Sequence, residues 1–310
     1  MKLEIFAFAA LVGSAFGVTA SAAETFGPLI DPATLSQKLD SNPPLVLDIR
    51  GGAYDEGHIP GAVSAPYAEF RGPKDNPGQL IPEDKLETLL QGLGVTLDRP
   101  VVVVHQGNTD TDFGAAARVY WTLKSSGVSQ LAILNGGMSA WSSADLPVDL
   151  AVTEPTPSDI DITFSTQWLA DTETVADVVE GRREAVLIDA RPADFYDGKK
   201  AHGAAARPGT LPGAVNVSHA SFFGDGQTAI DSDTASATAR VLDLAPGQEV
   251  VSFCNTGHWA ATDWFALSEL AGIENVKLYP ESMVEYSKTD HEMANTPGLL
   301  QNLINQVRAD

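Results

Sequence analysis

The feature that most limits how this chain can fold is a set of short motifs that occurs twice in the same order. Asp48-Ile49-Arg50 returns as Asp189-Ala190-Arg191, and Ile59-Pro60-Gly61-Ala62-Val63 returns as Leu211-Pro212-Gly213-Ala214-Val215. An internal duplication explains this repeated order better than chance does. We therefore expect two similar domains, one built from each copy.

Within each copy, short apolar runs alternate with longer amphipathic segments. In the first copy the runs predicted to be strands are residues 45–49, 101–105 and 131–134, and the segments predicted to be helices are residues 31–39, 82–93 and 114–125. Strands that alternate with helices at this spacing predict a parallel sheet covered on both faces. The expected fold class is therefore α/β.

The domain boundaries follow from the repeat and from one segment of different composition. Residues 24–150 are expected to form the first domain and residues 166–310 the second. Between them, residues 151–165 contain Pro155 and Pro157 among Thr, Ser and Asp, which is typical of a linker. The second domain is expected to end in an amphipathic helix over residues 297–310.

Charge composition narrows the class of partner. The 310 residues include 41 Asp and Glu against 19 Lys and Arg, which gives a net charge of −22. Such a chain repels nucleic acid and anionic membrane surfaces, so neither is expected as a partner. An anionic substrate must then be held by local dipoles and a few local cations.

The first 23 residues have the pattern of a cleavable secretory signal. Lys2 precedes an apolar stretch over residues 5–18, and small residues up to Ala23 suit cleavage. A buried helix or a membrane anchor is the alternative, but the stretch is short for a bilayer. We expect an exported, periplasmic protein without membrane contact after cleavage. Its single cysteine cannot form an intramolecular disulfide, which leaves a free thiol.

That cysteine lies at a predicted turn from a strand to a helix. The apolar run from Val250 to Phe253 leads to Cys254, Gly257 permits a tight turn, and a helical pattern follows. Backbone N–H groups of residues 255–260 can then surround the sulfur and favour the thiolate, which is the nucleophilic form. An inert, buried cysteine is the alternative.

The corresponding turn of the first copy lacks a nucleophile. His105 aligns with Cys254, and Asp110 and Asp112 follow where N–H donors would be needed. The first domain is therefore expected to be catalytically silent. The two aspartates could bind a metal ion, but loop carboxylates in so acidic a chain are more often solvated. One Cys and six His show no zinc spacing, and neither a metal nor an organic cofactor is expected.

Taken together, the motifs resemble those of the tandem rhodaneses, the thiosulfate and 3-mercaptopyruvate sulfurtransferases. The resemblance covers nearly the whole mature chain. It is carried by the two Asp-x-Arg strand ends, His58-Ile59-Pro60-Gly61-Ala62, Thr210-Leu211-Pro212-Gly213-Ala214, Leu134-Asn135-Gly136-Gly137 and the Cys254 loop. It implies two rhodanese-like α/β domains, of which the second is catalytic.

The resemblance also implies roles for individual residues. Cys254 would accept sulfane sulfur from a small donor such as thiosulfate or 3-mercaptopyruvate, and pass it to a thiophilic acceptor: cyanide, a thiol or a protein. The residues implied to bind the persulfide are Asn255, Thr256, Gly257, His258 and Trp259, and those implied to support the loop are Asp189 and Arg191. The pocket is expected between the domains, with residues 71–77 as one wall.

The loop departs from the thiosulfate enzymes of the family in ways that leave the donor open. Those enzymes often place basic residues directly after the cysteine and an arginine a few residues past Asp-x-Arg, where this chain has Asn255, Thr256 and Phe195. His258 is the nearest candidate cation; its side chain either points to solvent, or it favours the thiolate form of Cys254 or orients the donor. Trp259 is expected to wall the pocket or pack at the helix start.

Three other functions compete with this interpretation. A phosphatase with a similar cysteine turn needs an arginine six positions after the cysteine, where this chain has Ala260. A papain-like hydrolase is disfavoured because the Cys254 segment lacks that family's Cys-Trp opening. The remaining alternative is a sulfur-carrier or redox-partner module that a dedicated protein loads. Multiple turnovers with small donors would exclude it.

Overall fold

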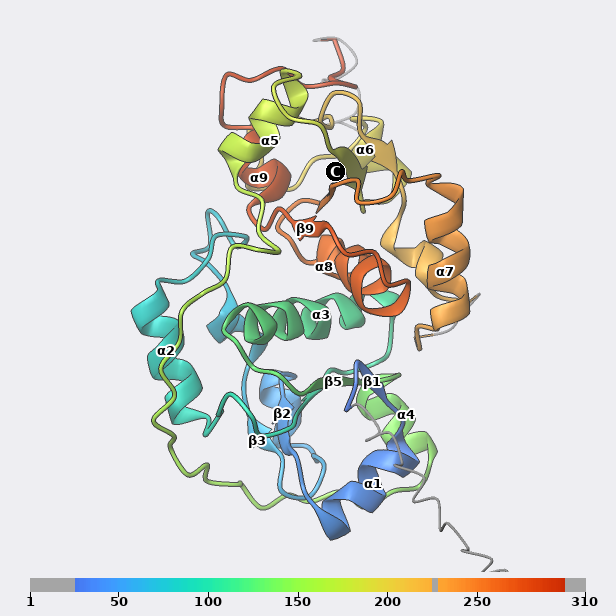
Figure 1. Cartoon of the computed structure of the whole chain (residues 1–310). Helices are drawn as coiled ribbons and strands as arrows, with labels where there is room; N and C mark the ends of the chain where they lie inside the picture. The colour runs from blue at the N-terminus through green and yellow to red at the C-terminus, as the bar shows by residue number, and fades with distance from the viewer. Residues whose placement is uncertain (1–25, 225–227, 299–310) are drawn as a thin grey trace, which may run out of the picture.

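Two domains, each built on a parallel β-sheet with helices on both faces, make up the molecule (Figure 1). The computed structural model describes residues 26–224 and 228–298. The strand order is β1-β5-β4-β2-β3 in the first sheet and β7-β6-β8-β9 in the second. The predicted fold class is therefore confirmed. The predicted signal and nearly all of the predicted final helix lie outside the described residues.

The first domain runs from β1 to α4, and its three central strands are buried along their whole length, which explains the continuous apolar runs in the sequence. Its elements are β1 (Leu29–Ile30), α1 (Pro32–Ser41), β2 (Leu45–Asp48), η1 (Gly51–Tyr54), β3 (Val63–Ser64), η2 (Tyr67–Phe70), α2 (Glu83–Gly92), β4 (Val101–Val104), α3 (Asp110–Ser125), β5 (Leu131–Leu134) and α4 (Gly137–Ser143).

The second domain repeats the order from the first helix onward, without a counterpart of β1 among the described residues, and its central strand β8 is buried along its whole length. Its elements are α5 (Thr172–Val179), β6 (Val186–Asp189), α6 (Ala193–Tyr196), β7 (Val215–Asn216), η3 (His219–Phe222), α7 (Ser232–Val241), β8 (Val250–Phe253), α8 (Trp259–Phe265), η4 (Ala266–Leu270), β9 (Val276–Leu278) and α9 (Ser282–Tyr286).

Helix α3 begins earlier than predicted, at Asp110 rather than Gly114. The carboxylate of Asp112 accepts hydrogen bonds from the backbone N–H groups of Asn108 at 2.8 Å and Thr109 at 3.0 Å. These bonds satisfy donors that a helix start leaves free, so the acidic residues favour the extra turn. The prediction that Asp110 and Asp112 lie in a loop was therefore wrong.

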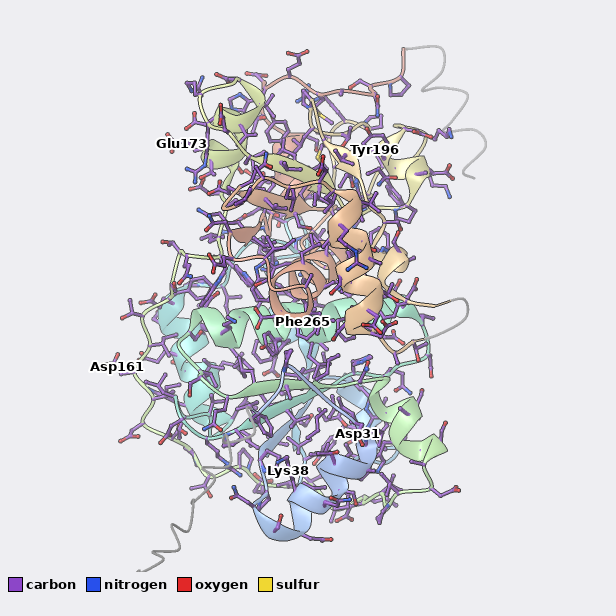
Figure 2. The ribbon with its side chains drawn as sticks, turned by 45° about the vertical axis from the view of Figure 1, so that its right-hand side comes forward. Asp31, Lys38, Asp161, Glu173, Tyr196 and Phe265 are labelled. Carbon is purple, nitrogen blue, oxygen red and sulfur yellow. The ribbon has the colours of Figure 1, made fainter. Side chains whose placement is uncertain are left out.

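The two domains meet where α3 packs against α8, and one apolar core continues across the contact (Figure 1). The ring of Phe265 lies at the level where the domains join (Figure 2). Its centroid is 5.0 Å from that of Tyr120 and 5.3 Å from that of Phe113, both from α3. At the edge of this contact, Lys124 of α3 pairs with Glu269 at 2.8 Å. The domain arrangement is thus set by packing.

The predicted linker, residues 151–165, contains neither helix nor strand and runs beside α2 of the first domain (Figure 1). Ile160 and Ile162 are buried, and the Ile162 N–H donates to the Glu87 carboxylate at 3.1 Å. The segment is therefore packed against the first domain. Across the described ranges, 26–224 and 228–298, every helix is too short or too polar to cross a membrane.

Candidate active site

Cys254 lies one residue beyond the end of β8, in a short turn that leads to the start of α8. Its side chain belongs to the apolar core that joins the two domains, and the residue is 1% exposed. No disulfide involves it. The structure therefore holds the thiol at the domain contact, away from bulk water.

The backbone of this turn is anchored by the start of α9. The hydroxyl of Ser282 accepts a hydrogen bond from the Cys254 N–H at 3.0 Å. The N–H groups of Met283 and Val284 donate to the carbonyls of Cys254 at 3.1 Å and Asn255 at 3.0 Å. Two carbonyl oxygens of the turn are thereby directed toward α9.

The N–H groups of the turn are left unused. Within the described part of the chain, the backbone N–H groups of residues 255–258 donate to no protein acceptor. Gly257 has a φ of +66°, a conformation that glycine adopts without strain. Converging free N–H groups can bind an anion, such as the outer sulfur of a persulfide.

Arg191 lies beneath the turn, where loop support was expected. Its Nε and Nη2 donate to the Asp189 carboxylate at 2.8 and 2.6 Å, and Nη2 also donates to the Gly209 carbonyl at 2.9 Å. Its remaining nitrogen, Nη1, donates to Oδ1 of Asn255 at 3.3 Å. A buried ion pair therefore braces the first residue after the cysteine.

His258 lies half-buried at the domain contact with both ring nitrogens hydrogen-bonded, so the alternative of a free, solvent-facing ring was wrong. Its Nε2 donates to the Thr111 carbonyl at 2.9 Å, which leaves Nδ1 to accept from the Tyr67 hydroxyl at 3.1 Å. Burial first, and then the charge of Arg71, lowers the pKa of His258 to about 4. Both contacting residues come from the first domain, which local sequence could not show.

Trp259 is part of an aromatic group at the start of α8. Its ring stacks on His219, with centroids 4.9 Å apart, and meets the edge of Phe195 at 5.9 Å. Its Nε1 donates to the Thr111 hydroxyl at 3.3 Å. This placement agrees with a packing role at the helix start. Phe195, at the position where thiosulfate enzymes often have an arginine, is therefore an aromatic neighbour of the loop.

Two arginines of the first domain reach the turn; sequence reasoning placed Arg71 only as part of a possible wall and did not name Arg118. Arg71 Nη2 donates to the Thr256 carbonyl at 2.8 Å. Arg118 of α3 is 1% exposed, and its Nη1 lies so near Gly257 that a Cβ there would come within 2.4 Å. The signal for Arg118 was a lone charge inside the apolar helical stretch of α3. The expected wall at residues 71–77 thus contributes Arg71.

The first domain has the same arrangement of an arginine, its aspartate and a side-chain amide around His105. Arg50 pairs with Asp48 at 2.7 Å and donates to Gln106 at 3.4 Å, as Arg191 does with Asp189 and Asn255 in the second domain. Both ring nitrogens of His105 lack partners in the described structure, and burial lowers its pKa to about 4. A cavity of about 450 Å³ adjoins this turn and is also lined by Tyr67 and His258.

A buried carboxyl group on α8 lies near Cys254. Both oxygens of Asp263, on α8, lack a hydrogen-bond partner among the described residues. Burial, and after it the charge of Cys254 when ionised, raises the pKa of Asp263 well above its usual value. A raised pKa favours the protonated, uncharged form of this acid.

Comparison with known proteins places this geometry in a family. The rhodanese-like domain family matches residues 31–144 and 172–289. Thiosulfate sulfurtransferase from Azotobacter vinelandii is 29% identical over 262 residues, covering 83% of this chain and 93% of that protein. The sulfur carrier protein TtuD from Thermus thermophilus is 26% identical over 245 residues, covering 75% of this chain and 83% of that protein.

A solved structure shares the fold of both domains. The crystal structure of SseA from Escherichia coli, described as a 3-mercaptopyruvate sulfotransferase, superposes with a TM-score of 0.70 at 24% identity. The superposition covers 83% of this chain and 98% of that one. The superposed region therefore includes both domains and the contact between them at which Cys254 lies.

Proposed function

The chain belongs to the rhodanese family, and on that premise we propose that it is a sulfurtransferase carrying sulfane sulfur on Cys254. The observation that carries the proposal is the setting of the thiol. Cys254 is buried at the domain contact, and the N–H groups of the four residues after it have no protein acceptor in the described structure. Such a site suits an anionic sulfur better than a neutral side chain.

In the proposed cycle the Cys254 thiolate attacks the outer sulfur of the donor. With thiosulfate, a sulfur–sulfur bond forms to Cys254, the donor's own sulfur–sulfur bond breaks, and its electron pair leaves on sulfite. The free N–H groups of residues 255–258 hold the charge on the outer sulfur of the persulfide. Cyanide or a thiol then takes that sulfur, and the bonding pair returns to Cys254 as thiolate.

Relatives support two donor classes. The Azotobacter vinelandii relative is a thiosulfate sulfurtransferase, and the Escherichia coli structure is linked to 3-mercaptopyruvate. Thr256 provides a hydroxyl in the loop, and neither Asn255 nor Thr256 adds positive charge there. We therefore propose a small anionic donor of one of these two kinds, with the cation supplied from outside the loop.

Intact-mass spectrometry of the purified mature protein tests the function. Wild type is treated with thiosulfate or with 3-mercaptopyruvate and then with cyanide, beside a Cys254→Ser variant. The expected result is a mass increase of one sulfur atom on wild type, removed by cyanide and absent from the variant. A wild type that gains no sulfur from either donor, or a Cys254→Ser variant that gains it equally, would falsify the proposal.

A second candidate function is that of a sulfur carrier loaded by a dedicated protein, which the similarity to TtuD favours. The two functions differ in turnover. A sulfurtransferase forms thiocyanate from small donors in large excess over protein, whereas a dedicated carrier forms at most one equivalent.

We also propose that the protein is exported and then cleaved near Ala23. Lys2, the apolar stretch over residues 5–18 and the small residues before Ala23 support this location. The mass of the protein recovered from the periplasmic fraction tests it. An uncleaved chain confined to the cytoplasm would exclude export.

A further inference from the structure

Four arginines lie at or near the Cys254 turn and the corresponding His105 turn of the first domain. They fall into two kinds. Arg50 and Arg191 each form an ion pair with the aspartate two residues earlier, at 2.7 and 2.6 Å. Arg71 and Arg118 have no carboxylate within ion-pair distance among residues 26–224 and 228–298. The first pair therefore has an internal counter-charge, whereas the second pair does not.

The unpaired arginines both face the turn that carries Cys254. Arg71 is half-buried, lies over the Tyr67 ring at 5.1 Å, and donates through Nη2 to the Thr256 carbonyl at 2.8 Å. Arg118 is almost fully buried, and its Nη1 lies against Gly257. The two guanidinium groups thus approach the loop from the first domain, one near solvent and one behind it.

Both arginines have hydrogen-bond donors without an acceptor among the described residues. In the described structure, Nη1 of Arg71 and Nε and Nη1 of Arg118 are buried without an acceptor. Burial, and then the charge of Arg71, lowers the pKa of Arg118 to about 10, as expected for two adjacent cations. Glu281 acts on Arg118 only through space, and burial raises the pKa of its own carboxyl. A half-buried and a fully buried cation that lack a counter-charge are stabilised by an anion placed near both.

We propose that Arg71 and Arg118 form an anion-binding site that holds the carboxylate or oxoanion group of the sulfur donor while Cys254 attacks its sulfur. This inference rests on the proposed function and deepens it. Guanidinium groups with several N–H donors suit planar carboxylates and tetrahedral oxoanions alike. The site explains how a loop with Asn255 and Thr256 after the cysteine can still accept an anionic donor, because the first domain supplies the charge.

The sharpest test uses two alkylating agents of similar size, anionic iodoacetate and neutral iodoacetamide. In both reactions the Cys254 sulfur forms a bond to carbon and iodide leaves with the electron pair. The quantity measured is the ratio of the two rate constants, divided by the same ratio for free cysteine. We expect Arg71→Gln to lower this ratio about tenfold to a hundredfold, the range for one charge-assisted hydrogen bond.

The matched control is Arg182→Gln, which removes an exposed arginine that pairs with Asp177 far from the loop in sequence. Its ratio should equal that of wild type. Arg118→Lys keeps the charge at the buried position and should retain more of the ratio than Arg118→Met. Because Arg118 is buried, thermal unfolding accompanies each variant, and Arg71→Gln decides the test if Arg118→Met does not fold.

Donor kinetics complete the test and identify the source of the anion. Arg71→Gln should raise the donor concentration for half-maximal persulfide formation at least tenfold, and whichever of thiosulfate and 3-mercaptopyruvate loads wild type names the donor. Equal losses of rate with iodoacetate and iodoacetamide would overturn the anion site, because they indicate a loop disturbed as a whole. If neither donor loads wild type, the proposed function fails, while the alkylation ratio still decides on the anion site.

Discussion

Gly257 is the position where one added methyl group should disturb the catalytic loop most. A Cβ at this residue would lie 2.4 Å from Arg118 Nη1 and 2.6 Å from the Pro280 carbonyl oxygen. Real Cβ atoms do not approach other atoms so closely, so Gly257→Ala requires the loop, Arg118 or Pro280 to shift. Its φ of +66° adds backbone strain for any other residue.

Gly272 supplies a matched control for the size of this effect. It lies in the same domain with a φ of +72°, and a Cβ there meets nothing within 4 Å. Left-handed backbone costs about 1–2 kcal/mol for alanine, which is the whole loss expected for Gly272→Ala. Steric overlap in a packed site adds about 1–3 kcal/mol. Gly257→Ala should therefore lower the free energy of unfolding by about 2–5 kcal/mol.

Urea unfolding followed by tryptophan fluorescence measures both variants, because Trp259 and Trp264 report on the second domain. The difference between Gly257→Ala and Gly272→Ala isolates the steric contribution from the backbone strain. Persulfide formation from thiosulfate should slow only in Gly257→Ala, since that substitution displaces Arg118. Equal free energies of unfolding for the two variants would refute the close packing of Arg118 and Pro280 around the loop.

Two further predictions concern the ion pair and the histidine at the loop. Asp189→Asn leaves Arg191 as an unbalanced buried cation and should cost about 3–5 kcal/mol of stability, as should Asp48→Asn for the first domain. Only Asp189→Asn should slow persulfide formation, because Arg191 contacts Asn255; equal kinetic losses would contradict the bracing role. His258, with a pKa lowered to about 4, takes up a proton on unfolding between pH 6.5 and 4. The contribution of the neutral imidazole to the free energy of unfolding is complete above pH 6.5 and is lost as the pH falls through 4. His258→Gln should therefore reduce the acid-side loss of the free energy of unfolding by up to about 3 kcal/mol. An unchanged pH profile of stability would show that the imidazole is not buried as a neutral group.

The fold could be predicted from sequence because its strands are short, buried and parallel. Residues 131–134 illustrate this, since their apolar run matches β5 residue for residue. The start of α3 could not be placed, because it depends on hydrogen bonds from residues 108 and 109 to the Asp112 carboxylate. Composition marks such aspartates as loop residues, whereas geometry makes them part of the helix start.

The candidate site was predictable only where its contacts are local in sequence. Cys254 follows its strand directly, and the Arg191 guanidinium reaches an aspartate two residues away. Arg71 and Arg118 meet the loop through packing between domains, which no spacing reveals. For the same reason sequence alone could not show the low pKa of His258, which depends on burial at the domain contact, where the ring meets Tyr67 and Thr111.

The loop of the second domain is also contacted by the first domain, which limits how the two halves can evolve separately. The copy with His105 has no nucleophile at this position, yet its Arg71 and Arg118 lie against the other copy's turn. Each half is thereby constrained by the other. A first half without arginines at these two positions would leave Cys254 in place but remove both guanidinium groups from its turn, so the second half depends on the first for its charge.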